Sequence, residues 1–194
     1  MRNVLAVAVI LASPLAAKTP LLNVQMEWRP TTTLTELGLS AINLVPFQGK
    51  TFTMTPFTDA RPEPACIGRN TETSTAGLQV TSRDPVAPWV SSHTQTFLTR
   101  LGLPLAEGPS GTVLSGQIMS FFVTEGSNYV GDVAIRVQVA KDGQTLWNGV
   151  ASGAARHFGR SYKLENYNET LSDSLQEAWV SLVRSEGFLK ALAQ

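Results

Sequence analysis

The chain has 194 residues, 43% of them hydrophobic, and its 15 Lys and Arg equal its 15 Asp and Glu in number. A chain without net charge creates no field that attracts nucleic acid or an anionic membrane, so we expect no nucleic acid as a partner. A single Cys excludes a disulfide within the chain, and stability must come from a packed core, for which the chain is long enough.

The first residues have the pattern of a secretory signal peptide. Arg2 precedes the apolar run 4–12, and Pro14 with small residues precedes a cleavage site after Ala17. This run is too short to span a bilayer, which takes about 20 residues, although an uncleaved anchor stays an alternative. We expect residues 1–17 to be removed and the remaining chain, which has no transmembrane segment, to be periplasmic or secreted.

The next part divides into an extended N-terminal arm, residues 18–50, and a single domain, residues 51–194. The arm has no sustained hydrophobic period, and its apolar pieces fit the edge of a sheet. Residues 51–57 alternate and predict a strand, in which Pro56 marks a sheet edge or the strand's end. Residues 61–82 are rich in Pro, Gly and Thr and predict a long surface loop, mobile or binding, with at most a short strand at 78–80.

A first helix is predicted from Asp84, as N-cap, with Pro85 at the first helical position. Apolar residues then recur three or four positions apart as far as Leu101, and Gly102 ends the pattern. We expect this helix to pack on a sheet.

Three antiparallel strands follow between residues 111 and 158: one at 113–124, one at 132–140 and a third that runs through 146–150. The middle one alternates most clearly, with Val133, Ile135, Val137 and Val139 on one face. The Asp142-Gly143 pair supplies the positive φ angles of a tight hairpin, and Gly149 and Gly153 allow bends or close packing in the third strand.

A second helix is predicted from 166–168 onward, and a short terminal turn follows a break at Glu186-Gly187. The apolar residues with helical spacing are Leu171, Leu175, Ala178, Trp179, Leu182 and Val183. The order of elements, β-α-β-β-β-α, predicts an α+β two-layer sandwich in which a mostly antiparallel sheet of about four strands packs against two helices.

The order and spacing of several short motifs from residue 52 to the end resemble the YajG-like family of bacterial envelope lipoproteins. These motifs are Asp59-Ala60-Arg61, Ile67-Gly68, Ser82-Arg83-Asp84, Gly116-Gln117-Ile118, Asp132-Val133-Ala134-Ile135, Gly143 and residues 168–175. The resemblance implies an envelope protein without known catalysis, associated in that family with the outer membrane through an N-terminal lipidated Cys. This chain departs from the family there, because its only Cys is Cys66.

No catalytic or metal-binding pattern stands out. Cys66, His93 and His157 lack the spacing of a metal site, and the adjacent Ser92 and His93 point in different directions on a helix. We therefore predict no enzyme activity, no cofactor and no metal; loss of an activity on changing either His would overturn this.

Six residues are candidates for binding a partner: Asp59, Arg61, Arg83, Phe121, Phe122 and Tyr129. The charged ones form a cluster with Asp84 if the chain returns on itself, or else cap backbone amides and fix a loop. The aromatic ones flank a hairpin tip at 125–128, where they serve recognition or fold back on the sheet.

Two functions fit these observations. The first is an exported, non-catalytic adaptor or assembly factor that binds an envelope protein through the sheet edge, the loop 61–82 or the hairpin tip. The alternative is a periplasmic carrier of a lipid or another apolar ligand held between the helices and the sheet.

Overall fold

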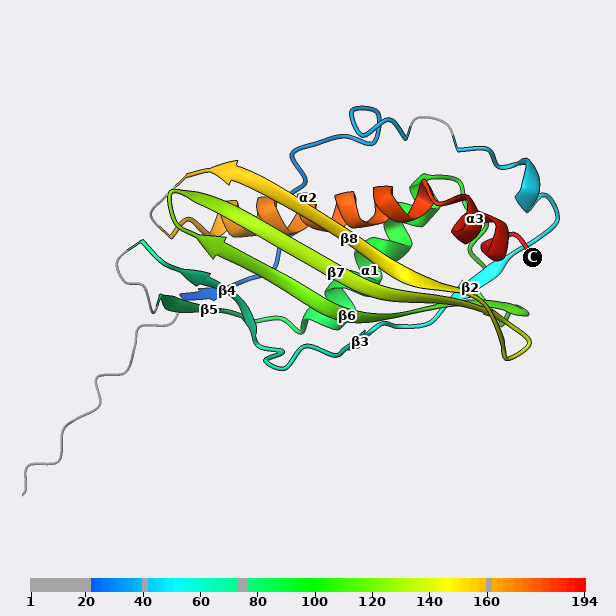
Figure 1. Ribbon diagram of the computed structural model, residues 1–194, viewed down its shortest axis with the longest axis horizontal. Coiled ribbons are helices and arrows are strands. Elements are labelled where there is room, and N and C mark those ends of the chain that lie inside the picture. The colour runs from blue at the N-terminus through cyan, green and yellow to red at the C-terminus, as the bar shows by residue number, and fades with distance from the viewer. Residues whose placement is uncertain (1–21, 40–41, 73–76, 160–161) are drawn as a thin grey trace, which may run out of the picture.

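A computed structural model describes residues 22–39, 42–72, 77–159 and 162–194. The predicted signal peptide lies outside these ranges. The fold is α+β: an eight-stranded sheet has its helices on one side, and the other side of the central strands faces the viewer in Figure 1.

The three longest strands of the sheet are the predicted antiparallel trio, β6 (Thr112–Glu125), β7 (Asn128–Lys141) and β8 (Gln144–Phe158), of which β8 is an edge strand. Val133, Ile135, Val137 and Val139 are fully buried against the helices, which confirms the expected dry face. The hairpin between β7 and β8 is also confirmed, since Asp142 and Gly143 have φ angles of 49° and 82°.

Five further strands make the sheet larger and more mixed than the predicted four. Along β6, on the side away from β7, lie three parallel strands: β2 (Phe52–Met54), β3 (Thr58–Asp59) and β4 (Cys66–Asn70). β5 (Leu78–Ser82) is antiparallel to β4, and β1 (Leu22–Val24) is parallel to β5. β2 and β5 confirm the strands predicted at 51–57 and 78–80. β1, β3 and β4 have two to five residues each, too few to show a period, and they pair with strands far along the chain.

The predicted loop 61–82 is wrong over much of its length. β4 and β5 form an antiparallel pair there, and Cys66, Ile67 and Val80 are buried. Pro62, Pro64 and Gly68 made the segment look irregular, but the prolines precede β4, and Gly68 lies where a Cβ would come 2.5 Å from the carbonyl oxygen of Val123. A glycine in this strand therefore marks close packing rather than a loop.

Helices α1 (Val86–Arg100), α2 (Leu164–Val183) and α3 (Glu186–Leu192) cover the inner face of the sheet (Figure 1). The predicted apolar stripe of α2 is confirmed, because all six of its residues are at most 4% exposed. The terminal turn is a third helix, with the hydroxyl of Ser185 accepting a hydrogen bond from the backbone N–H of Phe188.

Gly153 explains how closely α2 approaches β8. A Cβ at this position would lie 2.2 Å from the backbone nitrogen of Ala178 and 2.3 Å from the carbonyl oxygen of Ser174. The predicted role of this glycine in close packing is confirmed.

The predicted N-cap of α1 is wrong. Pro85 occupies the N-cap position, and no side chain caps the helix. A carboxylate oxygen of Asp84 instead accepts a hydrogen bond of 2.9 Å from the backbone N–H of Met26. The carboxylate of Asp84 binds the distant Met26 instead of a backbone N–H in the first turn of α1. A sequence pattern indicates only the local partner.

The described part of the arm is bound along α2. After β1, alternate backbone N–H groups donate to α2 side chains: Glu27 to Asn168 at 3.1 Å, Arg29 to Ser172 at 2.9 Å and Thr31 to Asp173 at 2.8 Å. Asn168 also donates to the carbonyl of Gln25. Further on, the short 3-10 helix η1 (Val45–Phe47) brings the chain to α3, where Phe47 and Lys50 line a groove with Leu189.

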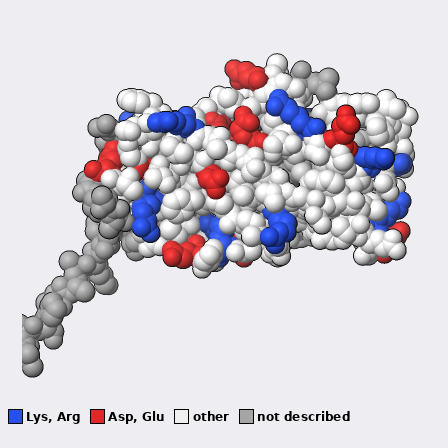
Figure 2. Space-filling view, in the orientation of Figure 1, with Lys and Arg blue, Asp and Glu red and all other residues white. Residues whose placement is uncertain are grey.

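The face of the sheet in Figure 2 carries basic and acidic side chains that are interspersed rather than gathered by sign. No helix in the described part of the chain is long and apolar enough to cross a membrane.

Candidate binding site beside strand β6

The outer neighbours of β6 leave a gap in the sheet. β3 pairs with β6 as far as Ile118, and β4 pairs with it from Val123 onward. Among the described strands, none lies beside residues 119–122 on this side of β6. β6 also shifts register against β7 between Ile118 and Ser120, a bulge that turns the following side chains.

Arg61 occupies this gap with its side chain. It is 8% exposed, and its Nη1 donates to the carbonyl oxygens of Cys66 at 2.9 Å and Phe121 at 3.2 Å. Nη2 donates to Pro64, and Nε and Nη2 donate to the carboxylate of Asp59 at 2.9 and 2.7 Å. All five N–H donors of the guanidinium thus have acceptors, and the side chain replaces the missing strand.

Asp59 is the counter-ion of Arg61. Burial alone would raise the pKa of the Asp59 carboxyl, but the hydrogen bonds and charge of Arg61 outweigh it, and the pKa is lowered. The carboxylate also accepts a hydrogen bond from the backbone N–H of Arg61. The ion pair between Asp59 and Arg61 fixes the loop that joins them. Of the two predicted roles, binding a partner or fixing a loop, this geometry fits the second.

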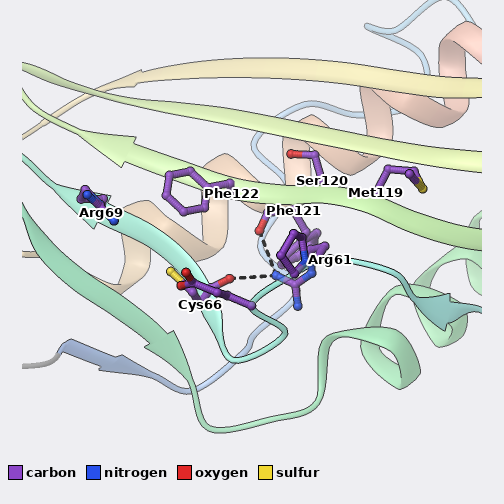
Figure 3. A pocket seen from close by; sticks show the side chains of 9 residues that line it. Arg61, Cys66, Arg69, Met119, Ser120, Phe121 and Phe122 are labelled. Atoms are coloured by element: carbon purple, nitrogen blue, oxygen red, sulfur yellow. Dashed lines mark hydrogen bonds between the residues drawn. The ribbon is translucent and has the colours of Figure 1, made fainter.

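A pocket of about 300 Å³ opens beside this ion pair (Figure 3). The guanidinium of Arg61 and the ring of Phe121 form one wall, with the guanidinium carbon 5.8 Å from the ring centroid. Met119, which is 38% exposed, and Phe122 add apolar surface, and the exposed Glu63 and Arg69 contribute opposite charges. The other lining residues are Pro62, Cys66 and Ser120.

Three of the six predicted site residues meet in this pocket: Arg61, Phe121 and Phe122. Asp59 lies behind it as the partner of Arg61. The sequence did not single out Met119, Glu63 or Arg69 as site residues. Met119 is the extra residue of the bulge at which the alternation of β6 shifts, and Glu63 and Arg69 were assigned to the loop.

Arg83 and Tyr129 lie elsewhere. Arg83 is exposed, and its backbone N–H binds Val24 while Asp84 binds Met26, so these two residues contact the arm instead of Asp59 and Arg61. The ring of Tyr129 is fully buried, as is that of Phe121, so both aromatic side chains fold back on the sheet.

Tyr129 belongs to a buried network around Glu125 at the hairpin tip. The carboxylate of Glu125, with no exposed surface, accepts hydrogen bonds from the hydroxyls of Tyr129 at 2.7 Å and Tyr167 at 2.5 Å and from the backbone N–H of Tyr162 at 2.9 Å. Burial alone would raise the pKa of Glu125, but these donors lower it, and burial next to this carboxylate raises the pKa of both tyrosines. The network joins the tip of β6 and β7 to α2.

The two histidines and Cys66 lie in different places. His93 stacks on Trp28, with ring centroids 4.5 Å apart, and burial lowers its pKa. Nε2 of His157 is 2.9 Å from a carboxylate oxygen of Asp173, and Cys66 begins β4. In the described ranges, no three His, Cys, Asp or Glu side chains come together as a group that holds a metal ion.

No protein-family model matches the chain, and no curated protein matches its sequence. A solved structure does match: protein XCC0632 from Xanthomonas campestris, which bears the family description DUF330, aligns with a TM-score of 0.55 at 11% identity. The match covers 84% of this chain and 92% of that one. The two chains share a fold.

Two other structures align less well. CT253, a hypothetical protein from Chlamydia trachomatis, has a TM-score of 0.47 at 9% identity over 74% of this chain and 99% of its own. Lipoprotein GNA1162 from Neisseria meningitidis aligns with a TM-score of 0.30 at 14% identity, and the match covers 59% of this chain and 90% of that one. Both TM-scores are too low to support the fold assignment. None of the three structures bears the name of the YajG-like family, so the resemblance to that family stays a prediction.

Proposed function

We propose that the chain is an exported envelope protein that acts without catalysis by binding a protein partner in the pocket beside β6. The observation that carries this proposal is the use of all five guanidinium donors of Arg61 inside the protein. Arg61 therefore serves to hold a pocket wall in place, and the surface that remains for a ligand includes the apolar side chains of Met119 and Phe122.

The size of the pocket fits part of a protein better than a whole lipid. About 300 Å³ is the lower end of the range for small-molecule sites, and this pocket is open to solvent. It would take one or two apolar side chains of a partner, with Glu63 and Arg69 at the rim for polar groups that flank them. Buried aromatic or aliphatic anchors of this kind contribute most of the affinity in protein interfaces.

The carrier alternative needs an apolar cavity between the helices and the sheet. That space is filled by large, fully or almost fully buried side chains such as Trp179 and Phe121, and Trp179 stacks on Phe57 at 5.9 Å. This packing favours the adaptor. The proposed envelope location is supported by the signal-peptide pattern, which predicts a protein of the periplasm or of the outside of the cell.

The test is affinity purification of the processed chain from its native envelope after cross-linking, with mass spectrometry of proteins and extracted lipids. We expect a stoichiometric protein partner whose recovery falls at least about tenfold in Met119→Glu, because the new carboxylate would be desolvated in the interface. Asn148→Glu, an exposed position on β8, is the matched control and should keep the partner. A bound lipid with no protein, or equal recovery with both variants, would contradict the proposal.

A further inference from the structure

We infer that the N-terminal arm supports the binding site from behind, and that Trp28 is a positioning residue which holds the pocket wall through Trp89 and Phe121. The role of Trp28 in binding rests on the proposed function. The ring contacts and the alkylation of Cys66 that tests them do not require a partner.

A continuous series of ring contacts joins the arm to the pocket. The ring of Trp28 lies 5.6 Å from that of Trp89 on α1, and Trp89 lies 5.6 Å from Phe121 on β6. On its other side Phe121 meets the guanidinium of Arg61 at 5.8 Å. His93 closes the cluster, since its ring is 4.5 Å from both tryptophans.

The backbone on both sides of Trp28 is fixed. The N–H of Glu27 donates to Asn168 and that of Arg29 donates to Ser172, both on α2. The ring of Trp28 meanwhile lies against α1. The arm thus bridges the two helices at the level of the pocket, and the position of Trp28 is set by α2 rather than by the ring contacts alone.

The pocket wall needs such support because β6 lacks a strand neighbour there. Phe121 lies opposite the gap between β3 and β4, where its outer contacts come from the side chain of Arg61. Its inner contact is Trp89, which is only half-buried and is backed by Trp28. Without the indole of Trp28, Trp89 gains room to move, and the wall formed by Phe121 and Arg61 loosens with it.

The chain contains its own reporter for this movement. Cys66 is its only cysteine, lines the pocket and is 7% exposed. Alkylation of Cys66 by iodoacetamide under native conditions therefore measures how often the wall opens. We expect Trp28→Ala to be alkylated about three to ten times faster than the unchanged chain, the factor that loss of one aromatic contact gives.

Two further variants make the result specific. Trp28→Phe keeps an aromatic ring and should restore slow alkylation. Trp147→Ala removes an equivalent contact at the other end of the helix layer, where Trp147 packs on Phe188 at 5.3 Å, and should leave the rate unchanged. An unchanged rate in Trp28→Ala, or an equal increase in Trp147→Ala, would overturn the inference. If Trp28→Ala is fast but no partner is ever recovered, the arm still positions the pocket and only the proposed function fails.

Discussion

Nη1 of Arg61 lies 3.2 Å from the carbonyl oxygen of Phe121, in the stretch of β6 that lies between its pairing with β3 and its pairing with β4. A side chain here satisfies a backbone carbonyl that a neighbouring strand would otherwise bind. The same guanidinium binds Asp59 with two hydrogen bonds and covers the ring of Phe121. One residue therefore closes the sheet and shapes the pocket.

Arg61→Lys should lower the free energy of unfolding by about 2 kcal/mol or more, although it conserves the charge. An ammonium has three donors without the planar fork, so carbonyl oxygens near the gap lose their partner. Urea denaturation measures the change. Arg83→Lys, at an exposed site, is the control and should stay within about 0.5 kcal/mol of the unchanged chain. Equal stability of both variants would show that the gap does not depend on the arginine.

Glu125→Gln should destabilise the fold by about 1–3 kcal/mol near neutral pH, because an amide cannot accept from both tyrosine hydroxyls with the strength of a carboxylate. The pKa of Glu125 is lowered below its ordinary value of 4.5, so ionised Glu125 stabilises the fold above that pH. This contribution is lost as the pH falls through the lowered pKa. Denaturation at neutral pH and at about pH 3 should therefore show a difference between the two chains that shrinks in acid; a constant difference would refute the linkage.

Gly153→Ala should cost about 3 kcal/mol or more, because the new methyl group meets the backbone of α2 at Ser174 and Ala178. Gly149→Ala in the same strand is the matched control. Its methyl group meets only the side chain of Trp147, which can turn away, so we expect a smaller loss. Thermal unfolding of the two variants should rank them in this order.

Asn168→Ala should release the arm from α2 without unfolding the domain. The change removes the acceptor for the N–H of Glu27 and the donor to the carbonyl of Gln25. Amide hydrogen exchange should become about thirtyfold faster at Glu27, in line with the loss of about 1 kcal/mol for each of the two hydrogen bonds, and stay slow in β7. Glu169→Ala, one residue further along the same helix, should leave the exchange at Glu27 unchanged.

The long elements of the fold could be predicted because their period is set by local geometry. β7 alternates between residues 132 and 140, and α2 keeps its apolar stripe from Leu171 to Val183, between three and four turns at about 3.6 residues per turn, so each reveals its buried face in the sequence. The alternation at 51–57 also predicted β2. The strands β1, β3 and β4 could not be predicted in this way, because each is short and pairs with a strand more than fifty positions away.

The candidate site was predictable only in part for the same reason. Arg61 and Asp59 are two positions apart, and their pairing is visible in the sequence. That Arg61 also binds Phe121 depends on the gap between β3 and β4, and a strand gap has no sequence signal. For the aromatic residues that flank the hairpin tip, the sequence left open whether they serve recognition or fold back on the sheet. Tyr129 folds back because its hydroxyl donates to the buried Glu125, and Phe121 folds back because it packs on Trp89.

The most direct test of a protein-binding pocket is site-specific photo-cross-linking in the native envelope. A photoreactive residue at Phe122, inside the pocket, should give one discrete protein adduct, and the same residue at Asn148, on β8, should give none. Equal labelling from both positions, or adducts with lipid alone at Phe122, would contradict the assignment of this pocket to a protein partner.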